Sequence, residues 1–70
     1  MTPLLTIRIN GSPRQVEEGS TLPALVAALG FAPETLLVEH NGTALHRGEW
    51  ERCLLAEGDS LEFLRIAAGG

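Results

Sequence analysis

The N-terminal part of the chain alternates apolar and polar residues, which is the pattern of a strand with one buried face. The alternation runs through residues 5–10 and places three apolar side chains on the same face. Asn10-Gly11 follows, and both residues tolerate the positive φ of a tight hairpin turn. Residues 14–17 then form the returning strand. The first 17 residues are therefore predicted to be a β-hairpin.

A helix is predicted next, because the apolar residues change from a period of two to the spacing of one helical face. Ser20 or Thr21 is suited to cap its N-terminus, and Pro23 is tolerated in the first turn. Gly30 fits the position after the last turn. The predicted apolar face consists of Leu22, Leu25, Val26 and Leu29. This face packs the helix against the rest of the core.

The second half of the chain contains further apolar segments that predict strands. The near-continuous apolar start of residues 36–40 is typical of an interior strand. The remaining predicted elements are a turn at Asn41-Gly42, a short strand at 43–45, a loop or single helical turn at 47–51, a turn at 57–59 and a last strand at 61–66. This order predicts an α+β protein of the β-grasp, or ubiquitin-like, class. Its mixed four- to five-stranded sheet packs on one helix.

The length of 70 residues allows one domain with one small core. Such a core has little room for a deep pocket, so a carrier, a binding module or a subunit is expected rather than a self-contained enzyme. No apolar run approaches the roughly 20 residues of a membrane span, and the N-terminal residues lack the pattern of a signal peptide. The expected compartment is the cytoplasm, and the free protein is expected to be a monomer.

The net charge of −4, with five arginines and no lysine, narrows the choice of partners. An acidic domain without a basic patch does not favour nucleic-acid binding, and it is better suited to a basic protein partner. Without lysine, the protein cannot form isopeptide-linked chains of itself. Arg47 is interpreted as a solvated surface charge, with pairing to an acidic residue of a partner, or to Glu49 or Glu51, as the alternatives.

Cys53 is the single cysteine, so an internal disulfide is excluded. Its neighbours Leu54 and Leu55 favour a small buried hydrophobic residue, while a persulfide or thioester carrier is the alternative. His40 and His46 with Cys53 match no zinc spacing. No nucleotide-binding fingerprint is present either, so no stably bound cofactor or metal is expected.

The last predicted strand has two different faces if it alternates strictly. Leu61 and Phe63 lie on the buried face, and Leu64 and Ile66 lie on the opposite one. Exposed apolar residues of this kind often contact partners, so we predict that Leu64 and Ile66 dock other proteins. A β-bulge that returns Leu64 to the core is the alternative. Trp50 is expected to cap one end of the core rather than to bind a ligand.

Several groups of residues resemble the ThiS family, the sulfur carriers of bacterial thiamine (thiazole) biosynthesis. They are Val38-Glu39-His40-Asn41-Gly42, Arg47, Trp50, Glu57-Gly58-Asp59-Ser60-Leu61-Glu62-Phe63 and the final Gly69-Gly70. The resemblance covers the whole chain in length and order of elements, and its specific part is the C-terminal half. His46 departs from the pattern, because the family usually has proline before the arginine.

The resemblance implies chemistry on the carboxylate of Gly70. Residues 1–66 would form the domain, and Ala67, Ala68 and Gly69 would form a flexible tail that gives Gly70 access to an enzyme. Four extended residues reach about 13–14 Å, and glycine allows a close approach because it has no Cβ. A frayed end is the alternative reading of two terminal glycines.

The resemblance also implies the partners. An E1-like (ThiF-like) adenylating enzyme would use ATP to activate Gly70, and a cysteine desulfurase system would supply sulfur to make a thiocarboxylate. A ThiG-like thiazole synthase would then take this sulfur, so the protein would be a co-substrate and not a catalyst. The alternatives are the small subunit of molybdopterin synthase, a ubiquitin-like modifier of other proteins, and an interaction domain that does not use its tail.

Overall fold

The computed structural model describes residues 1–66. Its elements, with η for a 3-10 helix, are β1 (Leu4–Ile9), β2 (Ser12–Glu17), α1 (Leu22–Ala28), η1 (Pro33–Thr35), β3 (Leu36–His40), β4 (Thr43–Leu45), η2 (Arg47–Arg52) and β5 (Ser60–Arg65). Every predicted strand and the predicted helix are present. The predicted tail at residues 67–70 lies outside the described residues.

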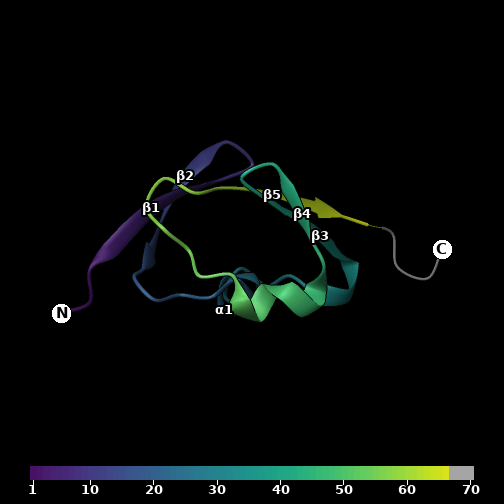
Figure 1. The fold of residues 1–70 in the computed structure, drawn as a ribbon, viewed down its shortest axis with the longest axis horizontal. Coiled ribbons are helices and arrows are strands. Elements are labelled where there is room, and N and C mark those ends of the chain that lie inside the picture. The colour runs from purple at the N-terminus through teal and green to yellow at the C-terminus, as the bar shows by residue number, and fades with distance from the viewer. Residues whose placement is uncertain (67–70) are drawn as a thin grey trace.

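The strands form one mixed sheet in the order β2-β1-β5-β3-β4. The two hairpins and the β3–β5 pair are antiparallel, whereas β1 and β5 are parallel. The last described strand, β5, therefore lies in the middle of the sheet, between β1 and β3, which precede it in the sequence. The sheet arches over α1 and η2, and the N-terminus and the end of β5 lie at opposite ends of the molecule (Figure 1). The predicted α+β fold with a mixed sheet on one helix is confirmed.

Two Asn-Gly turns close the hairpins as predicted. Asn10 and Asn41 both have φ of 50°, and the glycines after them have φ of 84° and 86°. Asn10 also reaches across to β5, where its Oδ1 accepts the N–H of Phe63 at 2.7 Å and its Nδ2 donates to the carbonyl of Phe63 at 3.1 Å. The first turn of the chain thus holds the last strand.

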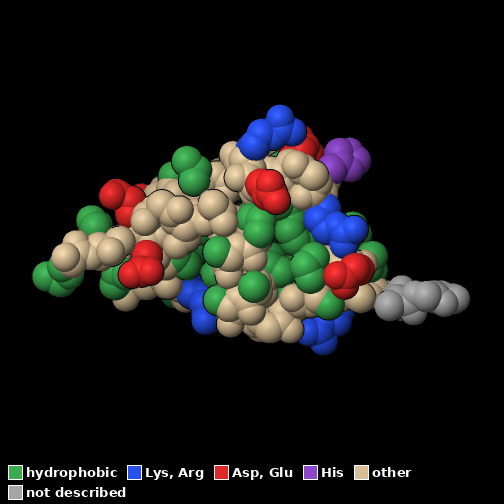
Figure 2. Space-filling view, turned by 90° about the horizontal axis from the view of Figure 1, so that it is seen from below, with side chains coloured by type: hydrophobic (Ala, Val, Ile, Leu, Met, Phe, Trp, Pro, Cys, Tyr) green, Lys and Arg blue, Asp and Glu red, His purple; other side chains and the backbone are tan. Residues whose placement is uncertain are grey.

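The short helix α1 begins and ends as the sequence predicts. The hydroxyl of Thr21 accepts the backbone N–H of Ala24, so Thr21 is the N-cap rather than Ser20. Gly30 ends the helix with a φ of 82°. Two leucines and a valine of the predicted apolar face are buried, and Leu29 packs at the edge of the core. The surface of the molecule on the side of α1 and η2 carries apolar side chains among charged ones (Figure 2).

The core is a single cluster between the sheet and the helices. Its buried members are Ile7, Val16, Leu22, Leu25, Val26, Leu36, Val38, Trp50, Leu55, Leu61 and Phe63. Trp50 is only 3% exposed, and it fills the space between η2 and the sheet. This burial agrees with the prediction that Trp50 packs against the core. No helix within residues 1–66 has the length and hydropathy needed to cross a membrane.

Some boundaries differ from those predicted. The second strand begins at Ser12 and not at Arg14, because β1 pairs with it up to the turn. The last strand ends at Arg65, so the prediction that Ile66 belongs to it is wrong. The reason is that β3 begins at Leu36, which lies opposite Arg65, so Ile66 has no residue of β3 to pair with. The N–H of Ile66 bonds instead to the carbonyl of Thr35 at 2.8 Å.

Candidate functional site

The end of β5 is held by an aromatic stack. The rings of Phe31 and Phe63 meet edge to face, with centroids 5.6 Å apart and an angle of 88° between their planes. The guanidinium carbon of Arg65 lies 5.1 Å from the centroid of the Phe31 ring. Contacts of these two kinds are each worth about 0.5–1.5 kcal/mol. They fix the last residues of β5 against the segment that follows α1, so the chain leaves the sheet in a defined place.

Leu64 faces solvent on the outer side of the sheet, directly opposite Leu37 on β3. Leu64 is 53% exposed and Leu37 52% exposed, and Ile66 just beyond the strand is 40% exposed. The regular register leaves no bulge at Leu64, so the alternative in which it returns to the core is wrong. The exposed apolar residues are therefore where the sequence predicts them. Their role in docking stays a prediction.

A hollow of about 240 Å³ lies beside the point where the chain leaves β5. Its walls include Leu37, Arg47, Trp50 and Ile66. Arg47 is exposed here, and the ion pair between His40 and Asp59 is the only one within residues 1–66. Arg47 thus pairs with neither neighbouring glutamate, which agrees with the interpretation of a solvated charge.

The start of β5 is held by a network centred on the buried carboxylate of Asp59. Its Oδ2 lies 2.9 Å from Nε2 of His40 and accepts the N–H of Ala56 at 2.9 Å. Its Oδ1 accepts Nδ2 of Asn41 at 3.1 Å. Burial opposes ionisation, but the bonds from His40, Ala56 and Asn41 outweigh it, so the pKa of Asp59 lies below its ordinary value.

This network was not predicted, although its residues lie in predicted turns. Asn41 also accepts the N–H of Ser60 through its Oδ1 at 2.8 Å, so both turns are joined across β3 and β5. The sequence feature that could have indicated this network is the pair of short polar side chains at Asn41 and Asp59, each next to a turn glycine. The network holds the frame of the sheet, and it contains no nucleophile.

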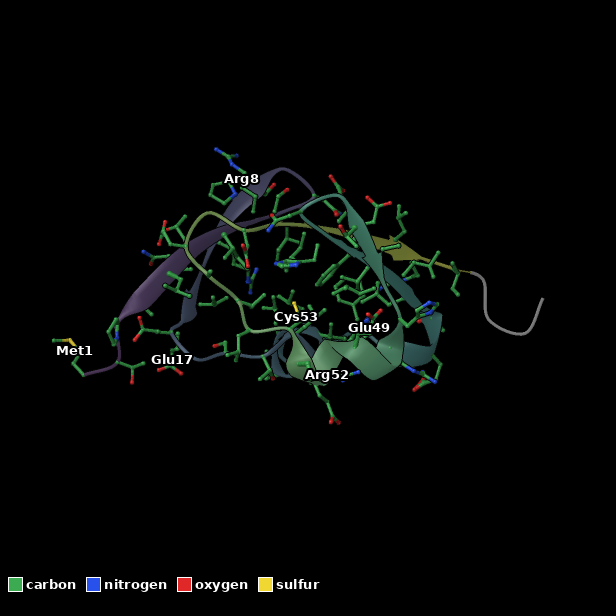
Figure 3. All side chains as sticks on the ribbon, in the orientation of Figure 1. Met1, Arg8, Glu17, Glu49, Arg52 and Cys53 are labelled. Carbon is green, nitrogen blue, oxygen red and sulfur yellow. The ribbon has the colours of Figure 1, made fainter. Side chains whose placement is uncertain are left out.

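Cys53 is half-buried, and its sulfur faces the interior between η2 and the sheet (Figure 3). Burial, and to a smaller extent the charge of Asp59, raise the pKa of its thiol. A raised pKa keeps the thiol protonated, which makes it a poor nucleophile. Cys53 and His40 both line a second hollow, of about 330 Å³. The imidazole of His40 is hydrogen-bonded to Asp59. The structure thus favours the buried-hydrophobe interpretation of Cys53.

His40, His46 and Cys53 are the side chains of the domain that most readily bind transition metals. Within the part of the chain that the structure describes, no group of three His, Cys, Asp or Glu residues is placed to hold a metal ion. The predicted chemical site at Gly70, and its access residues Ala67, Ala68 and Gly69, lie outside the described residues. The described residues therefore leave the prediction at Gly70 untested.

Comparisons with known proteins give one consistent result. A family model, the ThiS family, matches residues 7–70. A thiazole synthase of Magnetococcus marinus is 39% identical over 66 residues, which are 94% of this chain and 20% of that protein. The chain thus spans about a fifth of the length of that relative.

Two solved structures from Geobacter metallireducens share the fold. The crystal structure of its thiamine biosynthesis protein ThiS matches with a TM-score of 0.81 at 33% identity, and covers 94% of this chain and all of that one. A solution structure of a thiamine biosynthesis protein from the same organism matches with a TM-score of 0.74 at 32% identity, over 94% and 88% of the two chains. The chain therefore belongs to the ThiS family, the family of small sulfur carriers that its sequence resembles, and it has the ubiquitin-like β-grasp fold of that family.

Proposed function

We propose that this protein carries sulfur for thiazole formation in thiamine biosynthesis, on the carboxylate of Gly70. The observation that carries the proposal is the family match, which runs through residue 70 and includes the Gly69-Gly70 pair. Support comes from the central position of β5, because the strand that leads to these residues is held by neighbours on both sides.

The chemistry requires activation, since an α-carboxylate has a pKa of about 3.3–3.7 and is an unreactive anion at neutral pH. A carboxylate oxygen of Gly70 attacks the α-phosphorus of ATP in an adenylating enzyme, and pyrophosphate leaves. The terminal sulfur of a persulfide made by a cysteine desulfurase system then displaces AMP at the carbonyl carbon and forms an acyl disulfide. A thiol reduces this acyl disulfide, which releases the Gly70 thiocarboxylate and leaves the thiol's sulfur in a disulfide. ATP belongs to the partner enzyme, and the protein is a co-substrate that acts in the cytoplasm.

The proposed acceptor of the sulfur is a thiazole synthase. This choice of acceptor is supported by the thiazole synthase of Magnetococcus marinus, in which a region similar to this chain makes up a fifth of one longer protein. A domain joined to a synthase is held at high effective concentration beside it. This observation also favours the thiazole pathway over molybdopterin synthesis, which uses the same tail chemistry.

The test is the intact mass of the protein after incubation with an E1-like adenylating enzyme of the same organism, ATP, a cysteine desulfurase, cysteine and a dithiol reductant. We expect a mass gain equal to the exchange of one oxygen for sulfur, located at Gly70 by fragmentation. A variant that lacks Gly70 is the control, and it should keep the thermal midpoint of the parent and gain nothing. An unchanged mass with every such adenylating enzyme of the organism would contradict the proposal.

A second assay separates the two pathways. The sulfur-loaded protein is offered to a thiazole synthase with its other substrates, and in parallel to the large subunit of a molybdopterin synthase. Loss of the thiocarboxylate with the first enzyme alone supports the thiazole pathway. Loss with the second alone would move the protein to the other pathway and leave the carrier chemistry intact.

A further inference from the structure

The outer face of the sheet carries two acidic side chains in direct opposition. Glu39 on β3 pairs with Glu62 on β5, two residues along the same ladder from the exposed pair of Leu37 and Leu64. Residues directly opposite in an antiparallel pair have Cβ atoms about 4.5–5.5 Å apart, and like charges in this position are destabilising. We call these four side chains the β3–β5 patch.

The protein's own cations do not compensate this pair. Within residues 1–66, neither glutamate is in an ion pair. The cation that β1 contributes to the outer face is Arg8, opposite Ser60 (Figure 3). Its Nη1 donates instead to the carbonyl of Gly11 at 3.1 Å. The flank of Glu39 on the β4 side is occupied by Ala44, which is small and uncharged.

The neighbouring apolar pair makes this arrangement a contact surface rather than a solvated charge cluster. Leu37 and Leu64 are each about half exposed, and they lie diagonally from the two glutamates, about 7–8 Å away. An apolar pair beside an uncompensated acidic pair is complementary to a surface that offers apolar side chains around one cation. Arginine suits the position best, because its planar guanidinium can bond two carboxylates at once.

We propose that the β3–β5 patch is the docking surface for the thiazole synthase and that it receives an arginine or lysine of that enzyme between Glu39 and Glu62. This inference rests on the proposed function, and it adds the chemistry of the contact. The strand that carries Glu62 and Leu64 is the last described strand before residues 67–70, so a partner bound to the patch lies beside the point where the chain leaves the sheet. The cation of the partner would relieve the repulsion that the free protein carries.

The test compares two double variants of the full chain with equal changes in net charge. In the first, Glu39→Gln and Glu62→Gln remove the acidic pair. In the control, Glu18→Gln and Glu51→Gln remove two exposed glutamates from the turn after β2 and from η2. The affinity of each protein for a thiazole synthase of the same organism is measured by calorimetry at low and high salt, together with its thermal midpoint.

We expect the first variant to bind the synthase at least tenfold more weakly than the parent at low salt, and to lose most of the salt dependence of binding. Its thermal midpoint should be equal to or higher than that of the parent, because a like-charge pair has been removed. The control should bind as the parent does. A merely structural role for the glutamates would lower the thermal midpoint instead.

Equal binding by the parent and the first variant would overturn the inference, and so would an equal loss in the control. Weakened binding to the adenylating enzyme alone would assign the patch to that enzyme and overturn our choice of occupant. These outcomes are separate from the fate of the proposed function. Sulfur loading of Gly70, read by mass, tests the carrier chemistry whether or not the two glutamates matter for docking.

Discussion

Nε2 of His40 lies 2.9 Å from a carboxylate oxygen of Asp59, and this contact joins β3 to the turn that begins β5. Asp59 is only 8% exposed. If its carboxylate is removed, water therefore replaces the lost hydrogen bonds of its partners poorly. For Asp59→Ala we expect a loss of about 1–3 kcal/mol in the free energy of unfolding, the cost of leaving buried donors without an acceptor. Urea unfolding followed by Trp50 fluorescence measures it. Glu51→Ala at an exposed position is the control, and an equal change in both variants would contradict the prediction.

The same carboxylate predicts how stability depends on pH. The pKa of Asp59 is lowered in the folded state, so the unfolded chain binds a proton at a higher pH than the folded one. Its stabilising contribution is therefore complete above the ordinary value of about 3.9, and is lost as the pH falls through the lowered pKa. Urea midpoints between pH 6 and pH 2 should fall less steeply for Asp59→Asn than for the parent. Parallel curves would show that Asp59 is not the group responsible.

Cys53 should react slowly in the folded protein. Burial and the charge of Asp59 raise its pKa, so little thiolate is present at neutral pH. We expect alkylation by iodoacetamide at pH 7.5 to be about tenfold slower than in the urea-unfolded chain, as measured by intact mass. Cys53→Ala should accept sulfur at Gly70 at the parental rate. A native thiol as reactive as the unfolded one, or loss of sulfur loading in Cys53→Ala, would instead make Cys53 part of the chemistry.

Leu64→Asp should weaken partner binding without unfolding the domain. Leu64 is 53% exposed, so the change should alter the free energy of unfolding by no more than about 0.5 kcal/mol. A carboxylate placed in an apolar contact should weaken binding to the adenylating enzyme and the synthase at least about fivefold, as expected for an interface residue worth more than 1 kcal/mol. Ile66→Asp should act in the same direction.

Leu54→Asp is the matched control for this substitution. Leu54 is 64% exposed, but it lies beside Thr21 at the start of α1 and not on the outer face of the sheet. Its replacement should leave both affinities unchanged. If Leu54→Asp and Leu64→Asp weaken binding equally, added negative charge and not the outer face is responsible.

Much of the fold could be predicted from the sequence, because its signals are local. The Asn10-Gly11 turn, the Thr21 cap and the alternation that exposes Leu64 each depend on residues a few positions apart. The bonds of Asn10 to Phe63 and of His40 to Asp59 join residues 53 and 19 positions apart. They exist because β5 lies between β1 and β3, and hydrophobic periodicity does not specify which strands are neighbours. The end of β5 at Arg65 was missed for the same reason, since the start of β3 determines it.

The central position of β5 has a consequence for biosynthesis. On the ribosome, the strands that flank it emerge early but have no partner between them, and the core lacks Leu61 and Phe63. The nascent chain cannot complete its sheet until residues 60–65 have left the exit tunnel, whatever has already emerged before them. A chain interrupted before this strand lacks the centre of its sheet and two core residues, so we expect it to remain unfolded. The strand that leads toward Gly69-Gly70 is thus the one that must be synthesised before the domain can fold.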